Sequence, residues 1–139
     1  MIVADTTVVS ELMRREPAAA VVDWASGIDA RHLAITAITV AEIEYGLPRL
    51  PAGRRQRDLT QAWREVLTAH ADRLLAYDVG AARATAEILA ARDKAGHHVS
   101  LADAQIAGLC RSRGHSLATR NTRDFSGLGL DLINPFESG

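Results

Sequence analysis

The N-terminal stretch MIVADTTVVSEL, residues 1–12, joins a short apolar run at 2–4 to Asp5 and then to the apolar spacing of a helix. The same order recurs along the chain, where short apolar runs alternate with stretches of helical periodicity. Such alternation is typical of an α/β domain whose helices cover both faces of a mostly parallel sheet. We therefore predict strands at 2–4, 32–36, 74–77, 116–119 and 131–133, and helices at 8–14, 18–26, 38–45, 54–70, 79–95 and 101–113.

Length and charge narrow the classes of function. The 139 residues suit a single domain, 1–139, because two domains would each be unusually small. Sixteen Lys and Arg residues against 17 Asp and Glu residues give a formal net charge of -1, so no chain-wide positive field draws in a polyanion. Aromatic residues make up only 4% of the chain, which argues against a base-stacking platform. Contacts with nucleic acid must therefore come from local groups.

The cysteine content and the apolar segments predict a cytoplasmic protein with no membrane association. Cys110 is the only cysteine, so the chain forms no internal disulfide and no thiolate zinc cluster, as expected in a reducing cytosol. We expect Cys110 to lie in the core, because its neighbours are apolar. The N-terminal residues lack the pattern of a secretory signal, and the longest apolar stretch is far shorter than a bilayer requires.

Four acidic residues fall where an open parallel sheet binds its ligands, at the carboxyl ends of the strands. Asp5 follows the first predicted strand, Glu42 lies early in the helix after the second, and Asp124 follows the fourth. Asp103 joins them if its helix begins at the same edge. Four carboxylates gathered from distant segments repel one another unless a cation lies among them. Oxygen ligands without a His or Cys cluster predict a hard divalent cation.

Each acid also has a purely structural explanation. Asp5 is a favourable N-cap for the helix that follows it, and Asp124 is a favourable turn residue before Phe125. The other two acids complete capping-box patterns, Thr39-x-x-Glu42 and Ser100-x-x-Asp103. Gln replaces Glu in a capping box but brings no charge to a metal, so a Glu42→Gln variant separates the two interpretations.

The motifs around these acids resemble the PIN domain, and in particular the VapC-type toxins, including FitB-like ones, of bacterial toxin–antitoxin pairs. The segments are MIVADTTVVSEL at 1–12, ITVAEIEYG at 38–46, SLADAQIA at 100–107 and ATRNTRDF at 118–125. The resemblance extends from residue 1 to about residue 136 and is weakest over 48–70 and in the tail. It implies a PIN-like three-layer α/β/α sandwich whose central, mostly parallel sheet has about five strands.

The resemblance also implies an activity and a set of site residues. Such proteins are Mg²⁺- or Mn²⁺-dependent endoribonucleases, with one or two ions held by an acidic quartet. Carried over to this chain, the quartet is Asp5, Glu42, Asp103 and Asp124. Supporting roles fall to Thr6, Thr7, Thr119 and Asn121. Position 7 departs from the pattern, because relatives often have Asn there.

Hydrolysis by metal-activated water requires no histidine pair, so we expect His97 and His98 to lie in a solvated loop after Gly96. Arg120 and Arg123 flank the acidic loop and are the first candidates for phosphate contacts. Glu44 points about 200° away from Glu42 around their shared helix, and we expect it to face solvent or a partner.

The resemblance implies three partners: an RNA substrate, a second copy of the toxin, and a DNA-binding, VapB-type antitoxin whose C-terminal segment blocks the site. Two other functions stay open. The first is a catalytically inactive PIN-like module that binds RNA or protein. The second is a receiver-type phosphoacceptor domain, which the sequence favours less because Asp5 has no acidic neighbour and Lys94 lies in a helix.

Overall fold

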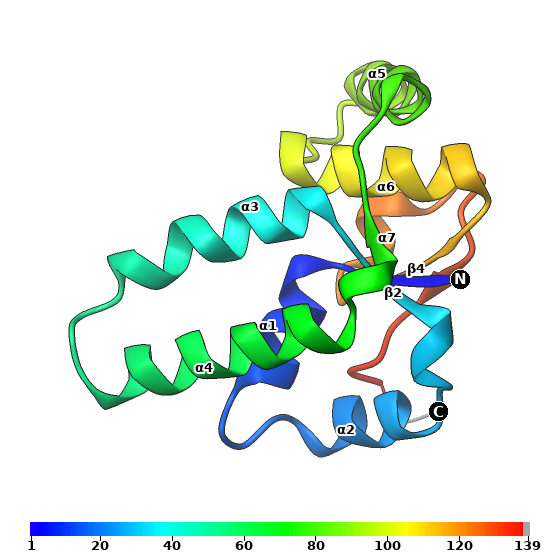
Figure 1. Ribbon diagram of the computed structural model, residues 1–139. Helices are drawn as coiled ribbons and strands as arrows, with labels where there is room; N and C mark the ends of the chain where they lie inside the picture. The colour runs from blue at the N-terminus through cyan, green and yellow to red at the C-terminus, as the bar shows by residue number, and fades with distance from the viewer. Residues whose placement is uncertain (138–139) are drawn as a thin grey trace.

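The computed structural model, which describes residues 1–137, contains one five-stranded parallel sheet (Figure 1). The strand order is β3-β2-β1-β4-β5, and every pair of neighbours is parallel. All five carboxyl ends therefore lie at one edge of the sheet. The strands are β1 (Ile2–Ala4), β2 (Leu33–Thr36), β3 (Leu74–Leu75), β4 (Ser116–Ala118) and β5 (Leu132–Ile133).

Helices cover both faces of this sheet, which confirms the three-layer α/β/α prediction. In Figure 1, α5 and α6 lie on one side of the strands, and α1, α2 and α4 lie on the other. The helices are α1 (Thr6–Met13), α2 (Ala19–Ser26), α3 (Ala37–Gly46), α4 (Arg54–Ala69), α5 (Val79–Lys94), α6 (Leu101–Arg113) and the short α7 (Thr122–Phe125).

Alternation along the strands divides the core in two, because successive side chains of a strand point to opposite faces. Val3 belongs to the cluster that α5, α6 and α7 cover, whereas its neighbour Ala4 belongs to the cluster of α1 and α4. Ala34 and Ile35 divide between the same two clusters. Cys110 is fully buried in the first cluster, as predicted, and burial raises the pKa of its thiol to about 12.

Helices α5 and α6 approach each other closely at Gly108. A Cβ added there would lie 2.7 Å from the backbone nitrogen of Thr85 and 2.9 Å from the carbonyl oxygen of Ala81. The hydroxyl of Thr85 donates to that same carbonyl at 2.8 Å and accepts from the Tyr77 hydroxyl at 2.9 Å. The absence of a Cβ at Gly108 thus allows the two helices to come this close.

Polar caps fix where the helices begin. Residues Asp5, Thr36, Asp78 and Ser100 each accept a hydrogen bond from a backbone N–H in the first turn of the following helix. At the other end of α6, Gly114 takes a left-handed φ of 70°, a conformation that glycine adopts without a Cβ clash.

Several predicted boundaries shift by one or two residues. Helix α1 begins at Thr6 and not at residue 8, because Asp5 caps it. The second strand begins at Leu33, since the residue before it closes a 3-10 turn, and the third ends at Leu75. The predicted loop at 120–125 contains the short helix α7, which the sequence pattern did not reveal. No helix within residues 1–137 combines the length and apolarity needed to cross a membrane.

Candidate functional site

Asp5 lies at the carboxyl end of the central strand, with only 7% of its surface exposed. One carboxylate oxygen, Oδ1, accepts the Val8 N–H at 2.9 Å, which confirms that Asp5 caps the following helix. The Asp5 N–H donates to the Ala118 carbonyl at 3.0 Å, which ties the residue to β4. The backbone and the cap therefore hold this carboxylate at the centre of the edge.

The electrostatic setting of Asp5 is unfavourable for its charge. The pKa of Asp5 is raised, chiefly because burial removes the carboxylate from water, and the nearby carboxylates of Asp103 and Glu42 raise it further. Hydrogen bonds from Thr119 and Val8 oppose this rise. A buried acid beside two other acids is the environment that a bound cation would stabilise.

Glu42 lies on α3, and its side chain reaches Thr6 at the start of α1. Its Oε1 accepts the Thr6 hydroxyl at 2.6 Å, and because Thr6 donates there, the Thr39 hydroxyl donates to Thr6 at 2.9 Å. The Thr39-x-x-Glu42 capping box is wrong, since Thr36 caps α3 and accepts the Thr39 N–H at 3.2 Å. Capping thus leaves Glu42 unexplained.

Asp103 occupies the first turn of α6, where its N–H donates to the Ser100 hydroxyl oxygen at 3.2 Å. The charge of Asp103 also helps to raise the pKa of Asp5, so α6 begins near the carboxyl edge, as the grouping of Asp103 with the other acids requires. Thr119 is fully buried and also accepts the Asn121 N–H at 3.1 Å, which anchors the loop after β4. Thr7 is exposed, and its hydroxyl bonds no carboxylate among residues 1–137.

Asp124 contacts His97, a residue that we predicted to lie in a solvated loop. The Nε2 atom of His97 lies 3.0 Å from Asp124 Oδ1, and both side chains are partly buried. The prediction that His97 lies in a solvated loop is therefore wrong, because its side chain is partly buried against Asp124. His98, its neighbour, is exposed.

Of the four predicted acids, two influence the pKa of the third, Asp5, and the fourth, Asp124, has a different partner. Asp103 and Glu42 act on the charge of Asp5, while Asp124 contacts His97. Within residues 1–137, no three Asp, Glu, His or Cys side chains are arranged closely enough to hold a metal ion. Glu42 is exposed and Asp103 is half-buried, and Thr6 holds one carboxylate oxygen of Glu42.

Comparison with known proteins identifies the family. The profile of the PIN domain matches residues 2–129, which is most of the chain. The chain belongs to the PIN domain family. Its fold prediction and its family resemblance are both confirmed by this match.

Relatives of this PIN domain match it over nearly their whole length. Plasmid stability protein StbB of Pseudomonas syringae pv. tomato is 41% identical over 139 residues, covering 99% of this chain and 100% of its own. VapC ribonuclease Y4jK of Sinorhizobium fredii is 41% identical and covers 99% of each chain. Toxin FitB of Neisseria gonorrhoeae is 31% identical and covers 98% of this chain and 99% of its own.

Solved structures share the fold. The crystal structure of FitAcB from Neisseria gonorrhoeae superposes with a TM-score of 0.89 at 30% identity, over 99% of this chain and 100% of that one. DNA-bound VapBC from Salmonella typhimurium superposes with a TM-score of 0.81 at 23% identity, covering 96% of this chain and 97% of that one.

The two candidate phosphate-binding arginines of this PIN domain differ in their surroundings. Arg120 stacks on Phe136, with its guanidinium carbon 4.5 Å from the ring centroid. Arg123 is exposed, and its side chain pairs with no acid among residues 1–137. Arg123 is therefore the more available of the two cations.

A groove of about 390 Å³ adjoins the acidic edge. It runs between α1, α3 and α4, and Thr6, Thr7 and Glu42 form part of its wall. Arg14 and Arg55 line it farther along. Arg14 pairs with Glu11 in the same groove, which leads from the two arginines to Glu42.

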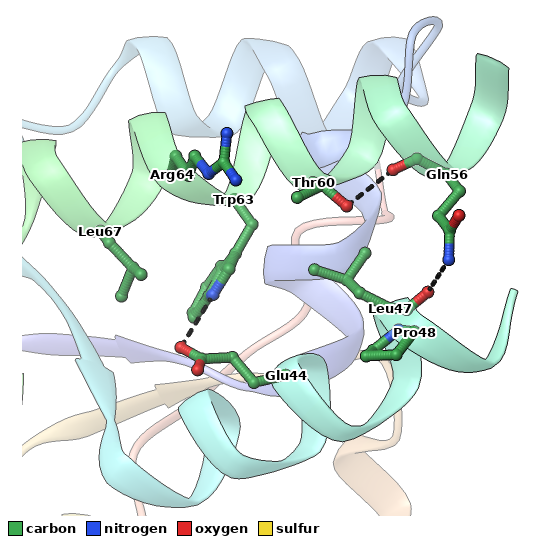
Figure 2. Close-up of a pocket in the computed structure, with 8 residues that line it drawn as sticks. All are labelled: Glu44, Leu47, Pro48, Gln56, Thr60, Trp63, Arg64 and Leu67. Atoms are coloured by element: carbon green, nitrogen blue, oxygen red, sulfur yellow. Dashed lines mark hydrogen bonds between the residues drawn. The ribbon is translucent and has the colours of Figure 1, made fainter. Parts of the chain in front are cut away.

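Glu44 is exposed, as predicted, but it also has a partner on a neighbouring helix. Its Oε2 accepts the Trp63 indole N–H at 3.1 Å, and the two side chains point toward each other between α3 and α4 in Figure 2. They line a separate hollow of about 480 Å³ that contains none of the four predicted acids. Glu44 thus orders the α3–α4 junction and stands outside the candidate site.

Proposed function

We propose that this chain is the toxin of a type II toxin–antitoxin system and cleaves RNA as a Mg²⁺- or Mn²⁺-dependent endoribonuclease. The names of its relatives support this proposal: Toxin FitB, VapC ribonuclease Y4jK, and, at 31% identity over 97 residues, tRNA(fMet)-specific endonuclease VapC of Shigella flexneri. The observation that carries it is the buried Asp5 carboxylate. Burial and two nearby acids both disfavour the negative charge of this group.

The residues that would hold one or two ions are Asp5, Glu42, Asp103 and Asp124. Their oxygen donors fit Mg²⁺ or Mn²⁺, which prefer carboxylates to imidazoles or thiolates. Such an ion would supply an activated water and stabilise the leaving oxygen of the phosphodiester.

The chain's own groups orient the carboxylates that would carry this chemistry. Val8 and Thr119 direct Asp5, and Thr6 directs Glu42. Thr119 in turn fixes the start of the loop that carries Asn121 and Asp124. Thr7 has no such contact, and we assign it no supporting role.

Partners follow from the relatives. Solved structures of FitAB bound to DNA and of VapBC complexes share the fold. By analogy, we infer that a VapB-type, DNA-binding antitoxin inserts its C-terminal segment at the acidic edge and blocks it, and that the toxin forms a homodimer in the cytoplasm. A catalytically inactive binding module is the second candidate, favoured by the open arrangement of the acids within residues 1–137. The family match excludes the receiver-type alternative.

The test of the proposed function is cleavage of an end-labelled single-stranded RNA by the antitoxin-free protein. We expect cleavage with Mg²⁺ or Mn²⁺, loss of cleavage with a chelator, and products that carry a 5′-phosphate. Cleavage that persists without a divalent ion would contradict the mechanism. RNA binding without cleavage of any RNA would favour the inactive module.

The Glu42→Gln variant separates metal binding from folding. Glutamine keeps the oxygen that accepts the Thr6 hydroxyl, and Glu42 caps no helix. The free energy of unfolding of the protein without metal should therefore change by less than about 0.5 kcal/mol. Loss of the charge should reduce Mn²⁺ affinity by more than about tenfold. Thermal unfolding with and without Mn²⁺ measures both effects.

Glu44→Gln is the matched control, because it makes the same change two residues along the same helix, outside the site. It should keep the full rise in melting temperature with Mn²⁺. An equally full response in Glu42→Gln would remove Glu42 from the proposed quartet.

Arg123→Ala tests the path of the substrate. If Arg123 contacts one phosphate, its removal should weaken RNA binding and lower the slope of log affinity against log salt by about one. Fluorescence anisotropy of a labelled RNA over a range of KCl concentrations measures this slope. Arg31→Ala is the control, because Arg31 pairs with Asp29 before β2, at the amino ends of the strands. Equal slopes for Arg123→Ala and wild type would place the RNA elsewhere.

A further inference from the structure

The last turn of α5 and the connection that follows it contact the Asp124 segment at one point each. His97 Nε2 lies 3.0 Å from Asp124 Oδ1, and the Arg92 guanidinium donates to the carbonyl of Ser126. The backbone links the two contacts, since the His97 N–H donates to the Arg92 carbonyl at 2.9 Å. Gly96 makes this turn possible with a left-handed φ of 68°.

The direction of the His97 bond follows from the chemistry of its partner. An ionised carboxylate only accepts hydrogen bonds, so the hydrogen lies on Nε2 and His97 is the donor. The bond uses Oδ1, while Oδ2 accepts no hydrogen bond from residues 1–137. One oxygen is thus held and the other is available to a ligand.

Helix α7, which carries Asp124, is too short to orient the side chain by itself. It has four residues, and the side chain of its N-cap, Asn121, makes no capping hydrogen bond. The Asp124 N–H donates to the Asn121 carbonyl at 3.1 Å, which fixes the backbone but leaves the side-chain torsions free. Within residues 1–137, His97 supplies the side-chain hydrogen bond of Asp124.

We propose that His97 is a positioning residue that holds the Asp124 carboxylate toward the acidic edge, so that Asp124 completes the metal site. This inference rests on the proposed function, in which Asp124 is a ligand of Mg²⁺ or Mn²⁺. Hydrogen bonds to ligating carboxylates orient them, and their loss typically reduces metal affinity about 10–100-fold. In this role His97 acts through Asp124 and is not itself a ligand of the ion.

The test compares His97→Ala with His97→Gln and His98→Ala in direct titrations of the antitoxin-free protein with Mn²⁺, followed by the electron paramagnetic resonance signal of free Mn²⁺. Glutamine places an N–H donor near the position of Nε2, whereas alanine removes it. His98→Ala makes the same truncation at the exposed neighbour. We expect His97→Ala to weaken Mn²⁺ binding by about 10-fold or more, and we expect His97→Gln and His98→Ala to bind Mn²⁺ like wild type.

A second readout is the rate of RNA cleavage as a function of Mn²⁺ concentration. Excess Mn²⁺ should restore the rate of His97→Ala, which general damage to the fold would not allow. Wild-type affinity in His97→Ala would overturn the proposal, as would tighter binding, since His97 would then hold Asp124 away from the ion. Equal loss in His97→Gln and His97→Ala would also overturn it, because the effect would not depend on the donor.

Asp5→Asn separates this inference from the proposed function. If wild type binds Mn²⁺ and Asp5→Asn does not, the metal site stands, and the His97 variants decide the inference alone. If wild type binds no Mn²⁺, the metal site and the role of His97 fail together.

Discussion

Replacing Asp5 with asparagine should reduce RNA cleavage by roughly a thousandfold, the scale of loss when one electrostatic group leaves a preorganised site. Asparagine has nearly the same shape, and its oxygen still accepts the Val8 N–H, so the cap survives. The charge that would bind the cation is lost. Single-turnover cleavage of a labelled RNA at saturating Mn²⁺ measures the effect.

The same substitution should stabilise the metal-free protein at neutral pH. The pKa of Asp5 is raised by burial, so the folded state holds a proton on this residue more readily than the unfolded state does. Ionised Asp5 therefore costs stability above its raised pKa, and that cost disappears as the pH falls below it. Asp5→Asn should melt at a higher temperature than wild type at pH 7, with a smaller difference under acidic conditions.

Two outcomes would contradict this account of Asp5. One is wild-type cleavage by Asp5→Asn, and the other is a lower melting temperature at pH 7 without metal. Asp23→Asn on α2 is the control, because Asp23 is exposed and should leave both quantities unchanged. Mn²⁺ at 100 times its dissociation constant should stabilise wild type by about 2.7 kcal/mol and leave Asp5→Asn unaffected.

The second large effect concerns the packing of α5 on α6. Gly108→Ala should lower the free energy of unfolding by about 1–3 kcal/mol, even though alanine is the better helix former by about 1 kcal/mol. The added Cβ would lie 2.7 Å from the Thr85 nitrogen and 2.9 Å from the Ala81 carbonyl oxygen, both of them backbone atoms that cannot rotate away. Urea unfolding followed by circular dichroism measures the change.

Gly80→Ala is the matched control on the facing helix. A Cβ at Gly80 meets only Asp78 Oδ1 at 3.6 Å, an ordinary contact, so helix propensity should prevail and stability should hold or rise. If Gly108→Ala were as stable as Gly80→Ala, the close approach of α5 and α6 at this point would be incorrect.

Patterns local in sequence predicted most of the fold. The apolar run at 2–4 predicted the central strand, and Asp5 directly after it marked the carboxyl edge and the first acid of the site. Ser100 and Gly114 marked the ends of α6, and the predicted helix matches the observed bounds. Such features depend on a residue and its near neighbours, which the sequence shows directly.

What could not be predicted are contacts between segments far apart in the chain. His97 and Asp124 are 27 residues apart, and a histidine after Gly96 resembles a solvated loop when viewed alone. Glu44 and Trp63 meet because α3 and α4 pack together, so the position of Glu44 on its own helix predicted its exposure but not its hydrogen bond.

The capping patterns show why short motifs need structural context. Ser100 caps α6 as its motif predicts, whereas Thr39 lies inside α3, because Thr36 is the cap. Because the helix begins about one turn earlier than the capping-box pattern implied, capping does not explain Glu42. The predicted quartet itself stays a prediction, and the effect of Asp103 and Glu42 on the pKa of Asp5 is the observation that favours it.

The most direct measurement is the anomalous diffraction of crystals of the antitoxin-free protein soaked in Mn²⁺. We predict an anomalous peak at the carboxyl edge of the sheet, with carboxylate oxygens of Asp5 and at least one of Glu42, Asp103 and Asp124 about 2.0–2.3 Å away. The strongest peak at any other place, or no peak at millimolar Mn²⁺, would contradict a metal site built on these acids.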